Sequence, residues 1–208
     1  MQTGLLEKLF GSAARIKIIR LFLLNPDTLF ISREISRRCK VVPNLVRREI
    51  SLLNKIGFIK QKKGLVDDLI KLKNGKIKNN KKKVRGWVLN ESFVFLSPLK
   101  NLVLDSVPVD REKIIRACKK AGKIKLIILS GIFVQSADSR VDILLVGDAI
   151  KKSALDRALR NIEAETGKEL TYAVFSTKEF AYRVGMYDRF VHDVLDYPHE
   201  KILNKMNV

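Results

Sequence analysis

The sequence has few of the residues from which metal sites and disulfide frameworks are built. Its 208 residues include two cysteines and two histidines. Cys39 and Cys118 lie in different halves of the chain, which argues against a disulfide scaffold and favours a reducing cytoplasm. His192 and His199 have no nearby cysteine to complete a zinc set. We therefore expect no metal site and no cofactor.

Long apolar runs are missing as well. No stretch approaches the roughly 18 apolar residues that a transmembrane helix requires. Near the N-terminus the apolar residues are interrupted by Glu7 and Arg15, which argues against a signal peptide. These features predict a cytoplasmic protein without a membrane partner.

Acidic residues are scarce relative to basic ones, and the imbalance lies in one half of the chain. The 41 Lys and Arg exceed the 22 Asp and Glu, giving a formal net charge of +19. Residues 1–87 hold 22 basic and 6 acidic residues, whereas residues 88–208 hold 19 and 16. A bias common to the whole chain would spread over both halves. The first half therefore favours a polyanionic partner, and the second half has another role.

Apolar periodicity and capping residues predict a series of helices in the first half. We expect helices over residues 3–10, from Ser12 to about residue 24, over 33–39 with Ser32 as the cap, and from Pro43 to about residue 56. In the last of these, Val46, Ile50 and Leu53 form a buried stripe. A short strand at 58–60, a lysine-rich loop and a returning strand at 85–89 follow.

The opposite face of the helix from Pro43 is polar and cationic, and carries Asn44, Arg47, Arg48, Ser51 and Lys55. A helix that enters the DNA major groove presents such donors opposite an apolar inner face. Residues 71–83 add seven lysines and no acid. The mutual repulsion of these lysines is a cost in free energy that has no explanation without a bound anion. A solvated helix face and a disordered loop are the alternative interpretations.

Two segments of the first half carry a family resemblance. LFGSAARIKIIRLFLLNPD and ISREISRRCKVVPNLVRREISLLNKIGFI, followed by the basic hairpin, resemble the winged helix-turn-helix domain of bacterial and archaeal regulators. The resemblance implies a recognition helix in the major groove and a wing on the phosphate backbone. The residues then expected to contact DNA are Arg33, Arg37, Arg38, Lys40, Asn44, Arg47, Arg48, Ser51, Lys55, Lys62, Lys63, Lys73, Lys76, Lys78, Lys81, Lys82, Lys83 and Arg85.

The second half predicts a small α/β domain. Apolar strands are expected at 125–129, 141–146 and 170–175, and helices at 149–166, 177–184 and 188–195. The segments LIILSGIFVQSADSRVDILLVGD, ALDRALRNIEAETGKELTYAVFSTKEFAYRV and DRFVHDVLDYP resemble the minimal nucleotidyltransferase domain that some regulators fuse to a winged helix. The resemblance thus extends over nearly the whole chain.

The resemblance also implies a damaged active site. Active members carry Gly-Ser after the first strand, Asp-x-Asp on the second and a third carboxylate that together hold Mg²⁺ and triphosphate. Here Gly131 remains, Ile132 replaces the serine, Arg140 replaces the first aspartate and Asp142 keeps the second. Thr171 falls near the position where the third carboxylate is expected. One carboxylate beside a cation binds Mg²⁺ poorly, so we expect no enzyme activity.

The sequence therefore predicts an α+β protein with a winged helix-turn-helix domain at 1–90, a helical connector at 91–122 and a nucleotidyltransferase-like domain at 123–208. We expect a nucleoid-associated, homodimeric regulator that binds double-stranded DNA. For the second domain two roles stay open: dimerisation through helix faces such as Leu155 and Leu159, or binding of a nucleotide or other anion effector at Gly131, Arg140 and Asp142. RNA binding, active nucleotidyl transfer and sequence-independent coating of DNA are the alternative functions.

Overall fold

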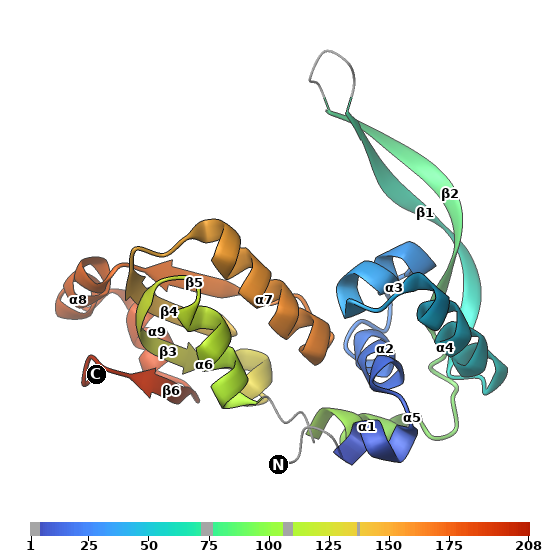
Figure 1. Cartoon of the computed structure of the whole chain (residues 1–208), viewed down its shortest axis with the longest axis horizontal. Coiled ribbons are helices and arrows are strands. Elements are labelled where there is room, and N and C mark those ends of the chain that lie inside the picture. Colours follow the sequence, from blue (N-terminus) through green and yellow to red (C-terminus); the bar gives the residue numbers. More distant parts are fainter. Residues whose placement is uncertain (1–4, 72–76, 106–109, 137) are drawn as a thin grey trace. The chain divides into compact units, whose positions relative to one another are not determined.

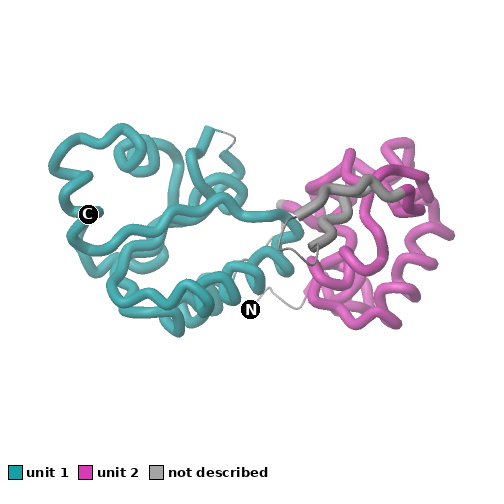
Figure 2. Tube along the Cα trace, turned by 90° about the horizontal axis from the view of Figure 1, so that it is seen from above, with its two compact units in different colours: residues 1–3, 107–208 teal, residues 4–106 magenta. Residues whose placement is uncertain are grey.

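The computed structural model divides the chain into two compact units, residues 4–106 and residues 107–208 together with 1–3 (Figures 1 and 2). It describes residues 5–71, 77–105, 110–136 and 138–208, with side chains described outside 66–71, 77–82 and 105. Helices and strands occur in both units, which confirms the predicted α+β class. Each unit has its own apolar core.

The N-terminal unit begins with four helices, which are α1 (Leu5–Phe10), α2 (Ala13–Leu23), α3 (Ser32–Cys39) and α4 (Pro43–Lys55). The Ser12 hydroxyl accepts a hydrogen bond from the N–H of Arg15 and caps α2, as predicted. Pro43 occupies the first turn of α4, also as predicted. The predicted cap Ser32 is wrong: Ile31 precedes α3 without a side-chain hydrogen bond, and Ser32 is already helical.

One apolar core joins these helices. Val46, Ile50 and Leu53 of α4 are buried, as the helical spacing predicts. They belong to the same cluster as Phe22 and Phe30, whose rings meet edge to face with centroids 5.5 Å apart. The inner face of α4 is thereby fixed, and its remaining face is left to solvent.

A long hairpin follows α4. Strands β1 (Ile59–Lys71) and β2 (Ile77–Leu89) pair antiparallel from Ile59 opposite Leu89 to Lys71 opposite Ile77. The expectation of short strands around a basic loop is therefore wrong. Backbone pairing continues through the lysine-rich segment, where the backbone of Lys71 lies opposite that of Ile77. Two backbone hydrogen bonds, of 2.9 and 2.8 Å, join Phe30 to Trp87 at the edge of β2.

The segment expected to connect the domains is split between them. Helix α5 (Leu96–Lys100) runs into a π-helical turn (Asn101–Asp105), and Leu96, Leu99 and Val103 pack on the N-terminal core. Helix α6 (Arg111–Lys119) instead packs in the C-terminal core through Ile114 and Cys118. Residues 91–122 therefore do not form one element.

The C-terminal unit is built on a four-stranded sheet of order β5-β4-β3-β6. Its strands are β3 (Lys123–Leu129), β4 (Ile143–Asp148), β5 (Tyr172–Phe175) and β6 (Glu200–Asn204), and β4 and β5 run parallel. The sequence analysis missed β6, which pairs antiparallel with β3. Only a five-residue strand with partly exposed side chains forms there, so its apolar pattern is weak.

Helices cover both faces of this sheet, which explains why β3 and β4 are apolar throughout (Figure 1). On one face Ile127 and Leu145 share a cluster with α6 and α7 (Lys152–Thr166). On the other, Leu126 and Leu144 share a cluster with α8 (Thr177–Gly185) and α9 (Arg189–Asp196).

Leu155 and Leu159 of α7 lie inside the first of these clusters, with 4% and 3% of their surface exposed. The expectation that these two leucines form a dimerisation surface is therefore wrong. The apolar stripe that suggested an interface is the stripe that attaches α7 to its own sheet.

Candidate nucleic-acid interface

The outer face of α4 presents all five of the polar residues expected there. Asn44, Arg47, Arg48, Ser51 and Lys55 are exposed. The residues on the opposite side of the same helix, which are Val46, Glu49, Ile50 and Leu53, are buried. A helix with one wholly buried face and one cationic face can enter a groove without disturbing the core.

An ion pair holds α4 from the inside. Arg15 of α2 donates through Nε to a carboxylate oxygen of Glu49 at 2.7 Å, and through an NH₂ group to the carbonyl of Phe10 at 2.7 Å. Glu49 is 6% exposed at its side chain and Arg15 26%. The pair therefore connects α2 with α4 and fixes the orientation of the cationic face.

The basic residues of α3 have different surroundings. Arg33 and Arg37 are exposed. Arg38 is partly buried: its guanidinium lies 5.3 Å from the centroid of the Phe30 ring and 3.3 Å from the carboxylate of Glu34. Lys40 is exposed at the left-handed C-cap of the helix. Among the predicted contacts on α3, Arg38 thus has an internal role that the sequence did not indicate.

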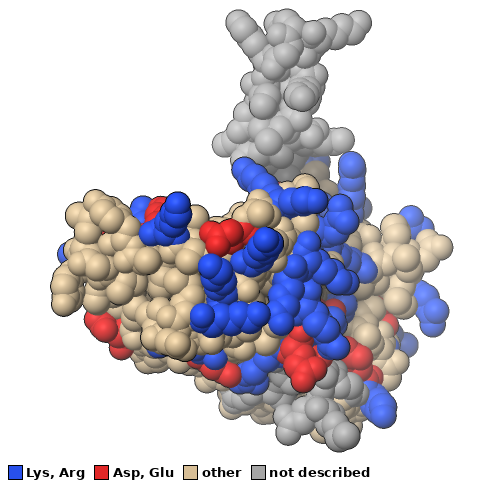
Figure 3. Space-filling model, turned by 60° about the vertical axis from the view of Figure 1, so that its left-hand side comes forward, with Lys and Arg blue, Asp and Glu red and all other residues tan. Residues whose placement is uncertain are grey.

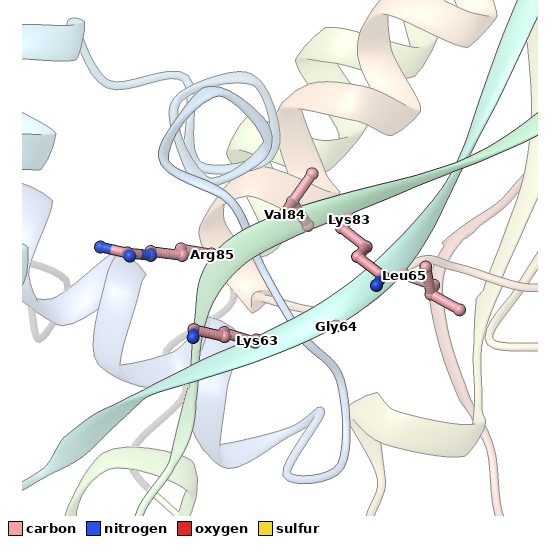
Figure 4. A pocket seen from close by; sticks show the side chains of 6 residues that line it. All are labelled: Lys63, Gly64, Leu65, Lys83, Val84 and Arg85. Carbon is pink, nitrogen blue, oxygen red and sulfur yellow. The ribbon is translucent and has the colours of Figure 1, made fainter.

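Three cations meet on one face of the hairpin. Lys63 lies directly opposite Arg85, and Leu65 lies directly opposite Lys83. With Gly64 and Val84 these residues line an open pocket of about 460 Å³ (Figure 4). Like charges opposite each other destabilise a strand pair, so a bound anion would reduce the repulsion between Lys63 and Arg85.

The other face of the hairpin is positioned by Leu29. A Cβ on Gly86 would lie 2.8 Å from the Phe30 carbonyl oxygen and 2.9 Å from the Leu29 side chain, and one on Gly64 would lie 2.5 Å from Leu29. At position 86 the backbone oxygen leaves room only for glycine, whereas at position 64 the end of the Leu29 side chain would have to move. The sequence analysis missed this contact, although two glycines in lysine-rich strands were its signal.

The structure describes the side chains of only some of the predicted wing residues. Lys62, Lys63, Lys83 and Arg85 are exposed. Lys78, Lys81 and Lys82 lie on β2, but their side chains are outside the description, and Lys73 and Lys76 lie outside the described residues. Lys60 is a further exposed cation that the sequence analysis missed. Figure 3 shows exposed lysine and arginine side chains in blue, with acidic side chains in red among them.

The three residues of the expected nucleotide site in the C-terminal unit are not all together. Gly131 and Asp142 are in contact. Arg140 is exposed and pairs with Asp193 of α9, with nitrogen–oxygen distances of 2.6 and 2.8 Å. The charge of Arg140 is thus already balanced by a carboxylate.

Asp142 acts as a brace between loops. It is buried, and its two carboxylate oxygens accept hydrogen bonds from the N–H groups of Ile132 at 3.0 Å and Thr171 at 2.8 Å. Among the residues that the structure describes, no group of three or more potential metal ligands occurs. The geometry of Asp142 is that of a structural carboxylate.

No protein-family model, no curated protein and no solved structure matches the chain. Within the described part of the chain, every helix is too short or too polar to span a bilayer.

Proposed function

We propose that the N-terminal unit binds double-stranded DNA, with α4 in the major groove and the β1–β2 hairpin along the phosphate backbone, and that the protein regulates transcription. The observation that carries this proposal is the division of α4 into a buried inner face and an outer face of Asn44, Arg47, Arg48, Ser51 and Lys55. The helix has room for a ligand on the side where its donors lie.

The side chains of this face have complementary roles. Arg47 and Arg48 carry planar guanidinium groups, which bind guanine O6 and N7 or phosphate oxygens in pairs of hydrogen bonds. Asn44 and Ser51 are short and suit a base edge or a phosphate close to the helix. Because α4 is held by the Arg15–Glu49 pair, these groups are presented on a rigid element.

The hairpin supplies contacts that depend little on sequence. Lys63, Lys83 and Arg85 on one face form a concentrated positive charge that phosphates neutralise. Each neutralised phosphate releases counterions, so the affinity should fall steeply as salt rises.

A homodimer belongs to the proposal, because a single recognition helix reads only one half-site. Because Leu155 and Leu159 are buried, such contacts would have to come from other residues. Sedimentation equilibrium at micromolar concentration tests this part, and a monomer with and without DNA contradicts it.

Nucleotidyl transfer has less support than DNA binding. Both oxygens of Asp142 accept hydrogen bonds from backbone N–H groups, and Arg140 is paired with Asp193. Neither group is arranged to hold Mg²⁺ and a triphosphate.

The proposal is tested by fluorescence-anisotropy titration against duplex DNA, single-stranded DNA and structured RNA at two salt concentrations. The double variant Arg47→Ala, Arg48→Ala should lose roughly tenfold or more in duplex affinity, since each contact of this kind is worth about 1–3 kcal/mol. The control variant Lys8→Ala, Lys100→Ala removes two exposed cations from α1 and α5 of the same unit and should bind as the parent does.

Two outcomes contradict the proposal. One is equal duplex affinity of the two double variants. The other is tighter binding to RNA than to duplex DNA, which would favour the RNA-binding alternative.

A further inference from the structure

A second group of cations lies on the C-terminal unit, where residues 107–208 hold 18 basic and 14 acidic residues. This group, called the α6–α7 cluster here, consists of exposed side chains at the end of α6 and the start of α7. Its members are Arg116, Lys119, Lys120, Lys123, Lys151 and Lys152.

The two segments of the cluster are joined by the backbone. The N–H of Lys151 donates to the carbonyl of Ala121 at 2.8 Å. The backbone of Lys123 lies opposite that of Asp148 at the first register position of β3 and β4. A Cβ on Gly122 would lie 2.8 Å from the Cα of Ile150, so the two loops are in direct contact. Cations about 30 residues apart in the sequence are therefore neighbours in space.

Asp148, the acid across the sheet from Lys123, is engaged elsewhere. Asp148 accepts hydrogen bonds from the N–H and hydroxyl of Thr177 and pairs with Lys125 at 3.4 Å. The Thr177 hydroxyl in particular holds the pKa of Asp148 below its usual value.

The six cations themselves have no ion-pair partner among the described residues. Glu112 and Asp156, each one helical turn from a member of the cluster, are the acids next along α6 and α7. The cluster therefore keeps most of its positive charge. The repulsion among these cations destabilises the unit when no anion is bound.

We propose that the α6–α7 cluster is a second DNA-contacting surface, which binds the phosphate backbone of the duplex. This second proposal rests on the proposed function, because it assumes that the N-terminal unit binds the same duplex. Lysine and arginine side chains without shape-specific neighbours suit phosphates and carry no sequence information. The C-terminal unit thereby adds affinity through a second site on the same duplex.

The test compares two charge-matched variants of the full chain on a 40-base-pair duplex. Lys119→Gln, Lys123→Gln removes two charges from the cluster, whereas Lys168→Gln, Lys178→Gln removes two exposed charges from other parts of the same unit. If two phosphate contacts are lost, affinity falls about tenfold at 0.1 M salt and the slope of log K against log salt falls by about 2. Equal melting temperatures show that both variants are folded.

The outcomes separate the two proposals. A lower affinity and slope for the cluster variant alone supports the second surface, and equal behaviour of both variants overturns it. A loss on structured RNA without a loss on duplex DNA also overturns it, because the cluster would then be an RNA surface. The Arg47→Ala, Arg48→Ala variant tests the α4 interface independently, so a failure of one surface is not a failure of the other.

Discussion

Asp142 occupies the space into which any side chain at position 131 would project. A Cβ on Gly131 would overlap the Oδ1 atom of Asp142 and lie 3.2 Å from its Cγ, and Gly131 has a φ of +56°. The glycine that resembles part of a phosphate-binding turn is required here for packing against a structural carboxylate.

Gly131→Ala should lower the free energy of unfolding by at least about 2 kcal/mol, because the left-handed backbone and the overlap with Asp142 both oppose a Cβ. Chemical denaturation measures the change. Gly185→Ala is the matched control, since no atom lies within 4 Å of its Cβ position and its helical site gains from alanine. If both variants prove equally stable, Asp142 does not constrain position 131.

The Arg15–Glu49 pair should be necessary for stability but not for the chemistry of the cationic face. Glu49→Gln leaves Arg15 without its charged partner and should destabilise the unit by about 1–3 kcal/mol. The exposed control Glu91→Gln should change stability by less than about 0.5 kcal/mol.

At a temperature where the Glu49→Gln variant is fully folded, its duplex affinity should stay within about twofold of the parent value. The core contacts of Val46, Ile50 and Leu53 still hold α4 there, and its exposed face is unchanged. Differential scanning calorimetry and anisotropy together check the pair of effects. A large loss of affinity in the folded variant would show that Glu49 acts on the recognition face itself.

The contact between Leu29 and Gly64 should appear as a coupling between the two positions. Gly64→Ala puts a Cβ 2.5 Å from Leu29 Cδ2 and should destabilise the hairpin, and Leu29→Ala removes the atoms that it meets. In a double-mutant cycle the second change should therefore offset part of the first, by about 0.5–1 kcal/mol. Additive effects would mean that Leu29 does not position the hairpin.

Both cysteines should be unreactive in the native protein. Burial raises the pKa of Cys39 to about 12 and that of Cys118 to about 11, so neither forms the nucleophilic thiolate near pH 8. A chromogenic disulfide reagent should detect no thiol in buffer and two in denaturant. A fast-reacting thiol in the native state would contradict the burial.

The same pKa values give a pH dependence. A thiol whose pKa is higher in the folded than in the unfolded state contributes stability that is complete below about pH 9. That contribution is lost as the pH rises from 9 toward the folded values. Replacing each cysteine by alanine should flatten the decline in this range, as measured by denaturation at several pH values.

The local elements were largely predictable from the sequence. Ser12 caps α2 as predicted, and Ser176 caps α8 in the same way, because each hydroxyl accepts a hydrogen bond from an N–H group only three residues away. The faces of α4 follow from 3.6-residue periodicity, which separates Val46 from Arg47 without reference to the rest of the fold. Local chemistry and a single period suffice for such features.

Other features depend on contacts between distant residues. The length of the hairpin depends on the pairing of two strands rather than on the composition of either. The partner of Arg140 is Asp193, 53 residues away, and the oxygens of Asp142 are taken by the N–H groups of two other loops.

The sequence by itself determined the α+β composition, the concentration of charge in the first half and the cationic face of α4, since each depends on residue type and local spacing. Only the tertiary structure decided that Leu155 and Leu159 are core and that Lys119–Lys123 and Lys151–Lys152 form one cluster. The physical reason is that burial and electrostatic potential depend on which segments are neighbours in space. A net charge summed along the chain does not show where cations from distant segments come together.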